Sequence, residues 1–330
     1  MSSAVTTQEL TLVEGVRDAL AVEMGRDERV MVLGEDVGEN GGVFRATEGL
    51  YEEFGEERVV DTPLAESGIV GSAIGLAMSG MRPVAEMQFS GFSYPAFDQL
   101  VSHASRIRYR SKGQYTCPLV VRMPYGAGIH APEHHSESKE AFFAHEPGLD
   151  VVIPSTPADA KGLLSSAIRD PDPVIVMEPK RIYRSFRGPV PDGEYTVPIG
   201  EANVRREGAD VSVFTWGAMC EPALGAAEEL AGDVEVEVVD LRSLSPLDVE
   251  TVTESVKKTG RAVVVHEAPM SGGFGGELAA TIQEEALFYL EAPIERVTGL
   301  DTHVPLHALE DFYLPNAARI VDAVESTMRV

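Results

Sequence analysis

The sequence predicts an α/β protein built from two doubly wound domains. Short apolar runs typical of buried strands alternate with longer segments of helical periodicity along nearly the whole chain. Parallel sheets covered by helices on both faces produce this alternation, because both faces of each strand are buried. The pattern lapses between residues 181 and 200, where glycine and proline are frequent. A chain of 330 residues accommodates two domains, so we expect the domain boundary between residues 181 and 200, where the alternation of strands and helices is absent.

Nine strands and eight helices are expected from these patterns. The strands lie at 30–33, 83–89, 119–123, 151–153, 173–177, 211–215, 234–240, 262–266 and 294–298. The helices lie at 7–25, 66–80, 95–112, 157–169, 219–231, 247–258, 276–289 and 316–328. Thr6 and Glu9 have the spacing of a capping box and predict the start of the first helix. We expect a first domain at 1–190, a linker at 191–200 and a second domain at 201–330.

Composition and charge exclude several classes of protein. With 53 acidic and 27 basic residues, the net charge of −26 argues against binding to nucleic acid or to anionic membranes. No stretch approaches the roughly 20 apolar residues of a membrane-spanning helix, and the first residues do not resemble a secretory signal. The two cysteines, Cys117 and Cys220, are too few and too far apart for a disulfide scaffold or a cysteine zinc cluster. We therefore expect a cytoplasmic protein.

The acidity of the chain has two interpretations. Acidic residues are dispersed along the sequence, and only six of the 27 basic residues are lysine. A dispersed acidic surface is typical of proteins adapted to high salt, where screening relieves the repulsion between like charges. The alternative is an acidic docking surface for a basic partner. Residues 201–330, with nine basic and 24 acidic residues, form the more acidic part.

Common nucleotide and nucleophile motifs are absent. The sequence contains neither a phosphate-binding G-x-x-x-x-G-K-[ST] loop nor a G-x-S-x-G nucleophile elbow. The run Ser271-Gly-Gly-Phe-Gly-Gly-Glu277 follows an expected strand, but Leu278 occupies the position of the third glycine of a dinucleotide-binding turn. We interpret this run as a structural tight turn.

The histidines do not have the spacing of a convincing zinc site. His303 and His307 are four residues apart, but Pro305 between them disfavours the helix that such a pair requires. The histidines between 130 and 135 lie in a loop that follows the strand at 119–123. Loops after parallel strands lie at the sheet edge where ligands bind in this architecture.

The most informative stretch is Val59–Ala77. A strand leads through Asp61-Thr-Pro-Leu-Ala-Glu66 into a helix rich in glycine and alanine, which indicates close packing against that helix. Glu66 stands in the first turn, where the helix dipole alone favours an acidic residue.

This stretch as a whole resembles the β subunit of thiamine-diphosphate-dependent 2-oxoacid dehydrogenases, members of the transketolase-like superfamily. The resemblance continues in order through residues 81–89, 94–99, 135–138, 142–145, 152–155, 159–163, 168–170, 239–242, 258–261 and 266–269. The branched-chain 2-oxoacid type is the most similar, followed by the pyruvate and acetoin types. The resemblance implies a pyrimidine-binding first domain and a second domain like the transketolase C-terminal domain.

The resemblance assigns roles to five residues of the first domain. It makes Glu66 the carboxyl that hydrogen-bonds the cofactor's pyrimidine nitrogen and exchanges a proton with it, as a general acid in a water-poor pocket can. Phe92 matches the ring that packs on the pyrimidine, and Gln88 and Leu64 match positions lining the pocket. His135 matches the histidine assigned to acyl transfer to lipoamide, a step suited to a group that titrates near neutral pH.

The resemblance also implies a structural potassium ion. The matching ligand positions, built largely from backbone carbonyls, are Leu119, Ala167, Ile168, Asp170 and Asp172. Asp172 stands where asparagine is usual in the family, so either a carboxylate binds the cation there or the change belongs to the general acidity.

Half of the expected active site is missing from this chain. In the family, Mg²⁺ and a G-D-G motif hold the cofactor's diphosphate, but the most similar segment here, Pro191-Asp-Gly193, lacks the first glycine. The resemblance therefore implies a separate α subunit, an α₂β₂ heterotetramer and a lipoylated dihydrolipoamide acyltransferase core as partners, with a small 2-oxoacid as substrate. The alternatives are an acetoin dehydrogenase β subunit, a non-catalytic α/β scaffold and a zinc hydrolase.

Overall fold

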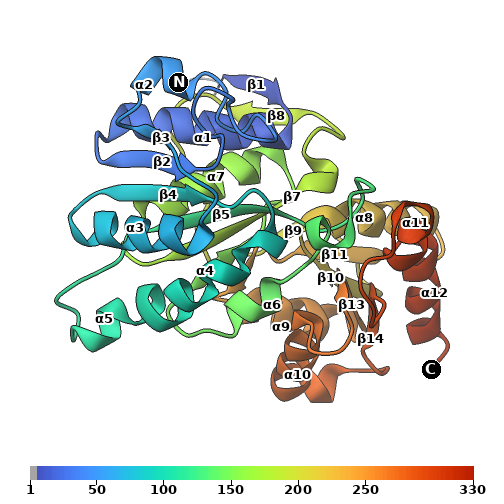
Figure 1. The fold of residues 1–330 in the computed structure, drawn as a ribbon. Coiled ribbons are helices and arrows are strands. Elements are labelled where there is room, and N and C mark those ends of the chain that lie inside the picture. The colour runs from blue at the N-terminus through green and yellow to red at the C-terminus, as the bar shows by residue number, and fades with distance from the viewer. Residues whose placement is uncertain (1–5) are drawn as a thin grey trace, which may run out of the picture.

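Two helix-covered sheets lie beside one another in the computed structural model, which describes residues 6–330 (Figure 1). All nine predicted strands overlap observed strands, and the predicted α/β class with two doubly wound units is confirmed. No helix in the described part of the chain is long and apolar enough to cross a bilayer.

The first sheet has seven strands in the order β12-β6-β7-β5-β4-β2-β3. Its strands are β2 (Val30–Gly34), β3 (Val59–Asp61), β4 (Arg82–Glu86), β5 (Val120–Tyr125), β6 (Asp150–Val152), β7 (Val174–Pro179) and β12 (Ser243–Ser245). Six of them are parallel, whereas β12 comes from the second half of the chain and pairs antiparallel with β6. The second half therefore completes the first sheet.

Helices cover both faces of this sheet. They are α1 (Leu12–Arg26), α2 (Leu50–Phe54), α3 (Glu66–Met78), α4 (Tyr94–Asp98), α5 (Ile107–Arg110), α6 (Glu140–Ala144) and α7 (Pro157–Arg169). Helices α1 and α7 pack together on one face, and α3 and α4 pack on the other (Figure 1). On strand β2, Val30 and Val32 join the core under α1, and Leu33 joins the core under α3. The alternation follows from the two-residue period of a strand.

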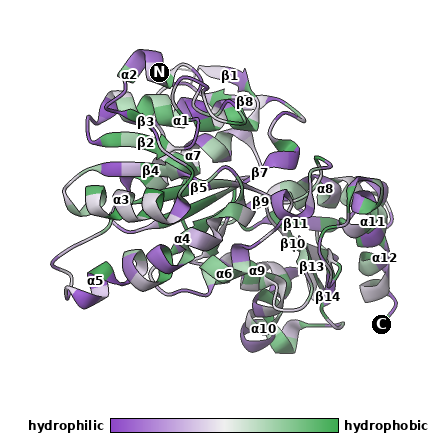
Figure 2. Ribbon diagram, in the orientation of Figure 1, coloured by the Kyte–Doolittle hydropathy of each residue, from purple (hydrophilic) through white to green (hydrophobic). Residues whose placement is uncertain are grey.

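The second sheet has five strands in the order β14-β13-β10-β11-β9, all parallel except β9. Its strands are β9 (Asn203–Arg206), β10 (Val211–Thr215), β11 (Val236–Asp240), β13 (Ala262–Pro269) and β14 (Glu295–Gly299). Its helices are α8 (Cys220–Glu229), α9 (Val249–Thr259), α10 (Phe274–Ala286), α11 (Glu310–Tyr313) and α12 (Ala317–Met328). Figure 2 shows hydrophobic residues gathered on the central strands and hydrophilic residues toward the outer loops and helix faces.

The predicted start of the first helix is wrong by five residues. Residues 7–10 form strand β1 (Thr7–Leu10), which pairs antiparallel with β8 (Gly188–Pro191) inside the predicted lapse. The capping box is made by Thr11 and Glu14, which have the same spacing as Thr6 and Glu9. The Thr11 amide donates to Glu14 Oε2 at 2.7 Å, and the Glu14 amide donates to Thr11 Oγ1 at 3.4 Å.

The predicted helix at 95–112 is interrupted. Between α4 and α5 the chain forms a π-helical turn at Gln99–His103 and a 3-10 turn at Ala104–Arg106. A π turn inserts an extra residue into the hydrogen-bond ladder, so the helical face of the following residues is rotated. Sequence periodicity alone does not reveal such a short change of winding.

A fully buried ion-pair cluster crosses the middle of the first sheet. Arg122 on β5 donates from Nε and Nη2 to the two carboxylate oxygens of Glu178 on β7, at 2.7 and 2.6 Å. Its Nη1 pairs with Glu86 on β4, and the Tyr183 hydroxyl donates to Glu178. The side chains of the three ions are at most 3% exposed. Such burial is tolerated only because the charges are paired and hydrogen-bonded.

We expect Arg122→Met to lower the free energy of unfolding by about 3–5 kcal/mol, because it leaves two carboxylates buried without a cation. Urea denaturation followed by circular dichroism measures this. Arg329→Met is the matched control, since the pair that Arg329 makes with Glu325 is exposed and its loss should change little. Equal midpoints for the two variants would contradict the role given to Arg122.

Candidate active site

Four of the residues singled out in the sequence meet at one edge of the first sheet. Glu66 is the first residue of α3 and follows β3, Gln88 and Phe92 follow β4, and His135 lies in the loop after β5. Strands β4 and β5 are parallel neighbours, and β3 is parallel to them on the far side of β2, so their carboxyl ends open at the same edge. Ligands bind at this edge in doubly wound sheets.

An aromatic cluster surrounds His135. Its ring is 4.6 Å from the ring of Phe89 and 5.1 Å from that of Phe92, both edge-on. Phe89 also packs edge-on against Phe44 at 5.4 Å, and His134 packs against Phe92 at 5.3 Å. The sequence analysis did not single out Phe44 or Phe89, although Phe89 ends one of the segments that carried the resemblance. The arrangement forms an apolar wall with one titratable group in it.

His135 is held in its neutral form more strongly than an ordinary histidine. Partial burial lowers its pKa below the usual 6.5, and the positive charges of His134 and Lys180 lower it further. Its Nδ1 finds no hydrogen-bond partner in the described part of the chain. A neutral imidazole with a free ring nitrogen can accept a proton from a bound group.

Three carboxylates gather beside the aromatic wall. Burial raises the pKa of Glu35, and the nearby negative charges of Glu66 and Asp36 raise it further. Gln88 Nε2 donates to Asp36 Oδ2 at 3.3 Å, which connects the expected pocket amide to this cluster. Both effects disfavour the charged form of the Glu35 carboxyl.

The candidate site lies on an open face of the chain. The Leu64 side chain is 79% exposed, and Gln88, Phe92 and His135 are only half-buried. The side chains of the site therefore remain accessible to a ligand or to a second surface. The chemistry of the wall fits an aromatic heterocycle, because it combines a stacking ring, an amide and a carboxyl.

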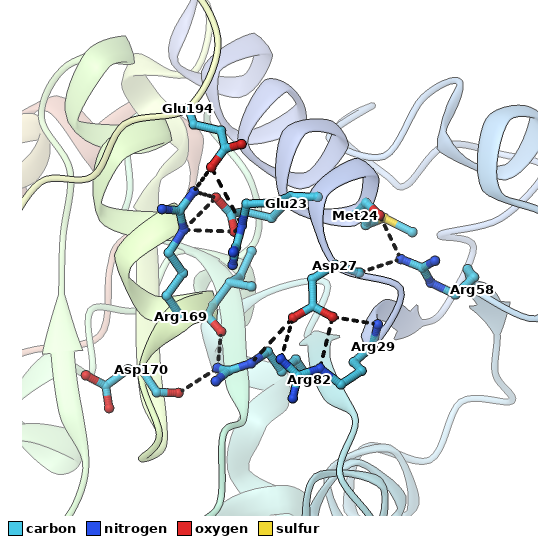
Figure 3. A network of polar contacts seen from close by, with 11 residues as sticks. Glu23, Met24, Asp27, Arg29, Arg58, Arg82, Arg169, Asp170 and Glu194 are labelled. Atoms are coloured by element: carbon cyan, nitrogen blue, oxygen red, sulfur yellow. Dashed lines mark hydrogen bonds and ion pairs between the residues drawn. The ribbon is translucent and has the colours of Figure 1, made fainter.

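The five residues matched to a potassium site lie at the opposite edge of the first sheet. Leu119 immediately precedes β5, and the others lie at the end of α7 and before β7: Ala167, Ile168, Asp170 and Asp172. Figure 3 shows that Arg82 reaches this group; its Nη1 donates to the carbonyls of Ile168 and Asp170 at 2.7 and 3.1 Å. The Asp172 carboxylate accepts from Arg108 Nε at 2.8 Å.

The carbonyl and carboxylate oxygens of this group are atoms of the kind that bind a monovalent cation. Burial raises the pKa of Asp150 to about 6, and the charges of Asp170 and Asp172 contribute to the rise. Burial likewise raises the pKa of Asp170. The charges of Arg108 and Arg82 oppose that rise for Asp170, and each carbonyl of the group keeps a second lone pair for a further ligand.

Comparison with known families divides the chain into two regions. Residues 8–185 match "Transketolase, pyrimidine binding domain", and residues 200–320 match "Transketolase, C-terminal domain". The chain is 51% identical to "Pyruvate dehydrogenase E1 component subunit beta" of Bacillus subtilis (strain 168) over 97% of this chain and 99% of the relative. The protein of the same name from Staphylococcus aureus (strain MW2) gives the same identity and coverage.

A solved structure supports the fold. The protein described as "Split gene transketolase, inactive beta4 tetramer" superposes with a TM-score of 0.78 at 24% identity, covering 98% of this chain and 99% of the other. At this identity the similarity concerns the fold alone.

We expect His135 to titrate below pH 6.5 in the folded protein, because burial and like charges disfavour its protonation. His134→Gln should raise that pKa, since it removes one of the neighbouring positive charges. Nuclear magnetic resonance of isotope-labelled histidines against pH measures both values. His145→Gln, at an exposed position that ends α6, is the control and should leave the His135 titration unchanged. A parent value at or above 6.5 would contradict the interpretation.

Proposed function

The chain belongs to the family of 2-oxoacid dehydrogenase E1 β subunits, and from this premise we propose that it forms one half of a thiamine-diphosphate site that decarboxylates a 2-oxoacid and acylates a lipoyl group. The observation that carries the proposal is the open face on which Glu66, Phe92 and His135 lie together. An acid, an aromatic ring and a neutral imidazole are the groups that this chemistry requires at one place.

Within this proposal, the residues of the open face have distinct tasks. Thiamine diphosphate, when bound, supplies the nucleophilic carbon for decarboxylation. Glu66 hydrogen-bonds the pyrimidine nitrogen and exchanges a proton with it, beside Glu35, whose pKa burial raises. Phe92 packs on the pyrimidine, and Gln88 and Leu64 line its edges. His135 then gives a proton to the lipoyl sulfur during acyl transfer, and its neutral resting form leaves a ring nitrogen free to take that proton up beforehand.

The other half of the site comes from an α subunit in this proposal. The chain has no G-D-G motif for the diphosphate and Mg²⁺, and Asp192 of the most similar segment lies at the end of the β1–β8 pair, where its amide donates to the Thr6 carbonyl at 2.9 Å. The assembly is an α₂β₂ heterotetramer in the cytoplasm that works with a lipoylated acyltransferase core. A K⁺ ion at the Asp170 edge pins the ends of α7 and β7.

Pyruvate is the favoured substrate. The curated relatives named above carry pyruvate in their names and are 51% identical to this chain. Branched-chain 2-oxoacids, the substrates of the type that the sequence resemblance ranked first, serve as the comparison substrates. The acyl chain is selected partly by α-subunit residues, so the paired subunits are required for the assay.

We expect the isolated chain to show no decarboxylation and the co-expressed α and β chains to decarboxylate pyruvate. The reason is that one chain presents only one wall of the cofactor site. Carbon dioxide release from pyruvate and from branched-chain 2-oxoacids, with and without the α chain, measures this. Turnover by the isolated chain would contradict the proposal that this chain forms only half of the site. Faster turnover of branched-chain 2-oxoacids would contradict pyruvate as the favoured substrate.

Glu66→Gln should lower the turnover of the assembled enzyme by about 10²–10⁴-fold, because an amide hydrogen-bonds the ring but cannot exchange a proton with it. Steady-state decarboxylation and the melting temperature are measured together. Glu52→Gln, an exposed acid in the first turn of α2, is the control and should leave turnover unchanged. Activity of the Glu66 variant within a few-fold of the parent would remove Glu66 from its role.

The acidity is proposed to be an adaptation to high salt rather than a docking surface alone. At a net charge of −26, repulsion destabilises the compact state until salt screens it. The melting temperature of the αβ assembly should therefore rise between about 0.1 M and about 3 M KCl without any acyltransferase present. A flat curve, with salt weakening only the acyltransferase affinity, would favour docking instead.

A further inference from the structure

The loop that carries His135 is closed on itself. It connects β5 to α6, and the Gly126 amide at its start donates to the Glu137 carbonyl near its end at 3.0 Å. Gly126 and Gly128 have φ angles of +84° and +96°, which side chains rarely adopt. His135 therefore lies near the end of a loop that returns to its own start, and that end is also held by the Ser90 hydroxyl, which donates to the Glu137 carbonyl at 2.8 Å.

Two carboxylates of the second half of the chain hold these first residues. Glu267, near the end of β13, accepts a hydrogen bond at Oε2 from the Ala127 amide at 2.9 Å. Glu310, the first residue of α11, accepts from the Gly128 amide, and its other oxygen lies 3.4 Å from His130 Nδ1. The two acids are 3% and 0% exposed. They contact the loop across 140 and 182 residues of sequence.

The loop backbone lies directly against the Glu267 carboxylate. A Cβ atom at Gly126 would stand 2.6 Å from Glu267 Oε1, closer than real contacts allow. A Cβ atom at Gly128 would stand 2.5 Å from Arg181 Cδ. The absence of a side chain at Gly126 therefore leaves room for the Glu267 carboxylate, and its absence at Gly128 leaves room for the Arg181 side chain.

Lys180 supplies the opposite charge. It follows β7, is 3% exposed, and its Nζ has no hydrogen-bond partner among residues 6–330. Burial lowers its pKa to about 8, and the charges of Glu267 and Glu310 oppose that fall. Burial raises the pKa of Glu267, and the hydrogen bond from the Ala127 amide and the charge of Lys180 oppose that rise. Lys180 is also one of the charges that lower the pKa of His135.

We propose that Glu267 and Glu310 are positioning residues for His135, which hold the first residues of the loop at 126–135 and so help to keep its imidazole against Phe89 and Phe92. The inference rests on the role proposed for His135. In this proposal the second domain contributes to acyl transfer through two hydrogen bonds to backbone amides of the loop. It does so without contact with the substrate. Neither acid reaches the reacting atoms.

The test uses the assembled αβ enzyme carrying Glu267→Ala, Glu267→Gln, Glu310→Ala or Glu310→Gln. The glutamine variants keep an oxygen that accepts the loop amide, whereas the alanine variants remove it. Hydrogen–deuterium exchange of a peptide spanning residues 126–135 reports the loop directly. Two assays report catalysis: acylation of lipoamide, and decarboxylation with an artificial electron acceptor. Glu250→Ala, an exposed acid in the first turn of α9, is the matched control.

The alanine variants should exchange the loop amides about tenfold faster, because the closed state loses a hydrogen bond. Lipoamide acylation should fall about 10–100-fold, as misplacement of a reacting group predicts, while decarboxylation and the KM for the 2-oxoacid change little. The glutamine variants should restore the loop protection and most of the transfer rate. His135→Ala should reproduce the loss of transfer without a change in exchange.

Three outcomes would overturn the proposal. The first is unchanged exchange of the loop in both alanine variants, and the second is faster exchange with an unchanged rate of acylation. The third is a glutamine variant that keeps the loop protected yet loses transfer, which would assign the effect to charge instead of position. A parent assembly without decarboxylation would count against the proposed function, and the exchange measurement would still decide whether the acids hold the loop.

Discussion

The burial of Arg122 between Glu86 and Glu178 is the constraint on which the rest of the structure depends. A guanidinium in a sheet interior is stable only with both carboxylates in place, so β4, β5 and β7 are held in one register. A slip by one residue would turn these side chains to the opposite face. The carboxyl ends of β4, β5 and β7 therefore have fixed positions relative to one another. The residues that follow these strands are fixed in the same way.

The same cluster extends to the aromatic wall of the site. Tyr183, whose hydroxyl bonds to Glu178, packs edge-on against Phe44 at a ring distance of 5.3 Å. Phe44 packs against Phe89, which in turn contacts the ring of His135. The half-buried rings of the wall are thus packed through Phe44 and Tyr183 onto the core, which favours preorganised side chains at a catalytic position.

Much of the architecture could be predicted because it depends on local patterns. Continuous apolar runs identified the strands, and the rule for parallel sheets placed the loop of His135 at the ligand-binding edge. The roles of Glu66 and Phe92 came from the family resemblance and not from the strand pattern. The wrong helix start came from a repeated spacing, since Thr6 with Glu9 and Thr11 with Glu14 both fit a capping box and only tertiary pairing of β1 selects between them. The acids at 267 and 310 were missed because contacts across 140 and 182 residues leave no local signal.

Strand β12 has a consequence for the order in which the protein is made. During synthesis, the six parallel strands of the first sheet are complete once residue 179 has emerged, but β6 stays an open edge until residues 243–245 follow. At about 5–20 residues per second, the ribosome leaves that edge unprotected for several seconds. An unpaired edge is a template for association with other chains. The nascent first domain is therefore most exposed to aggregation before its own chain is finished.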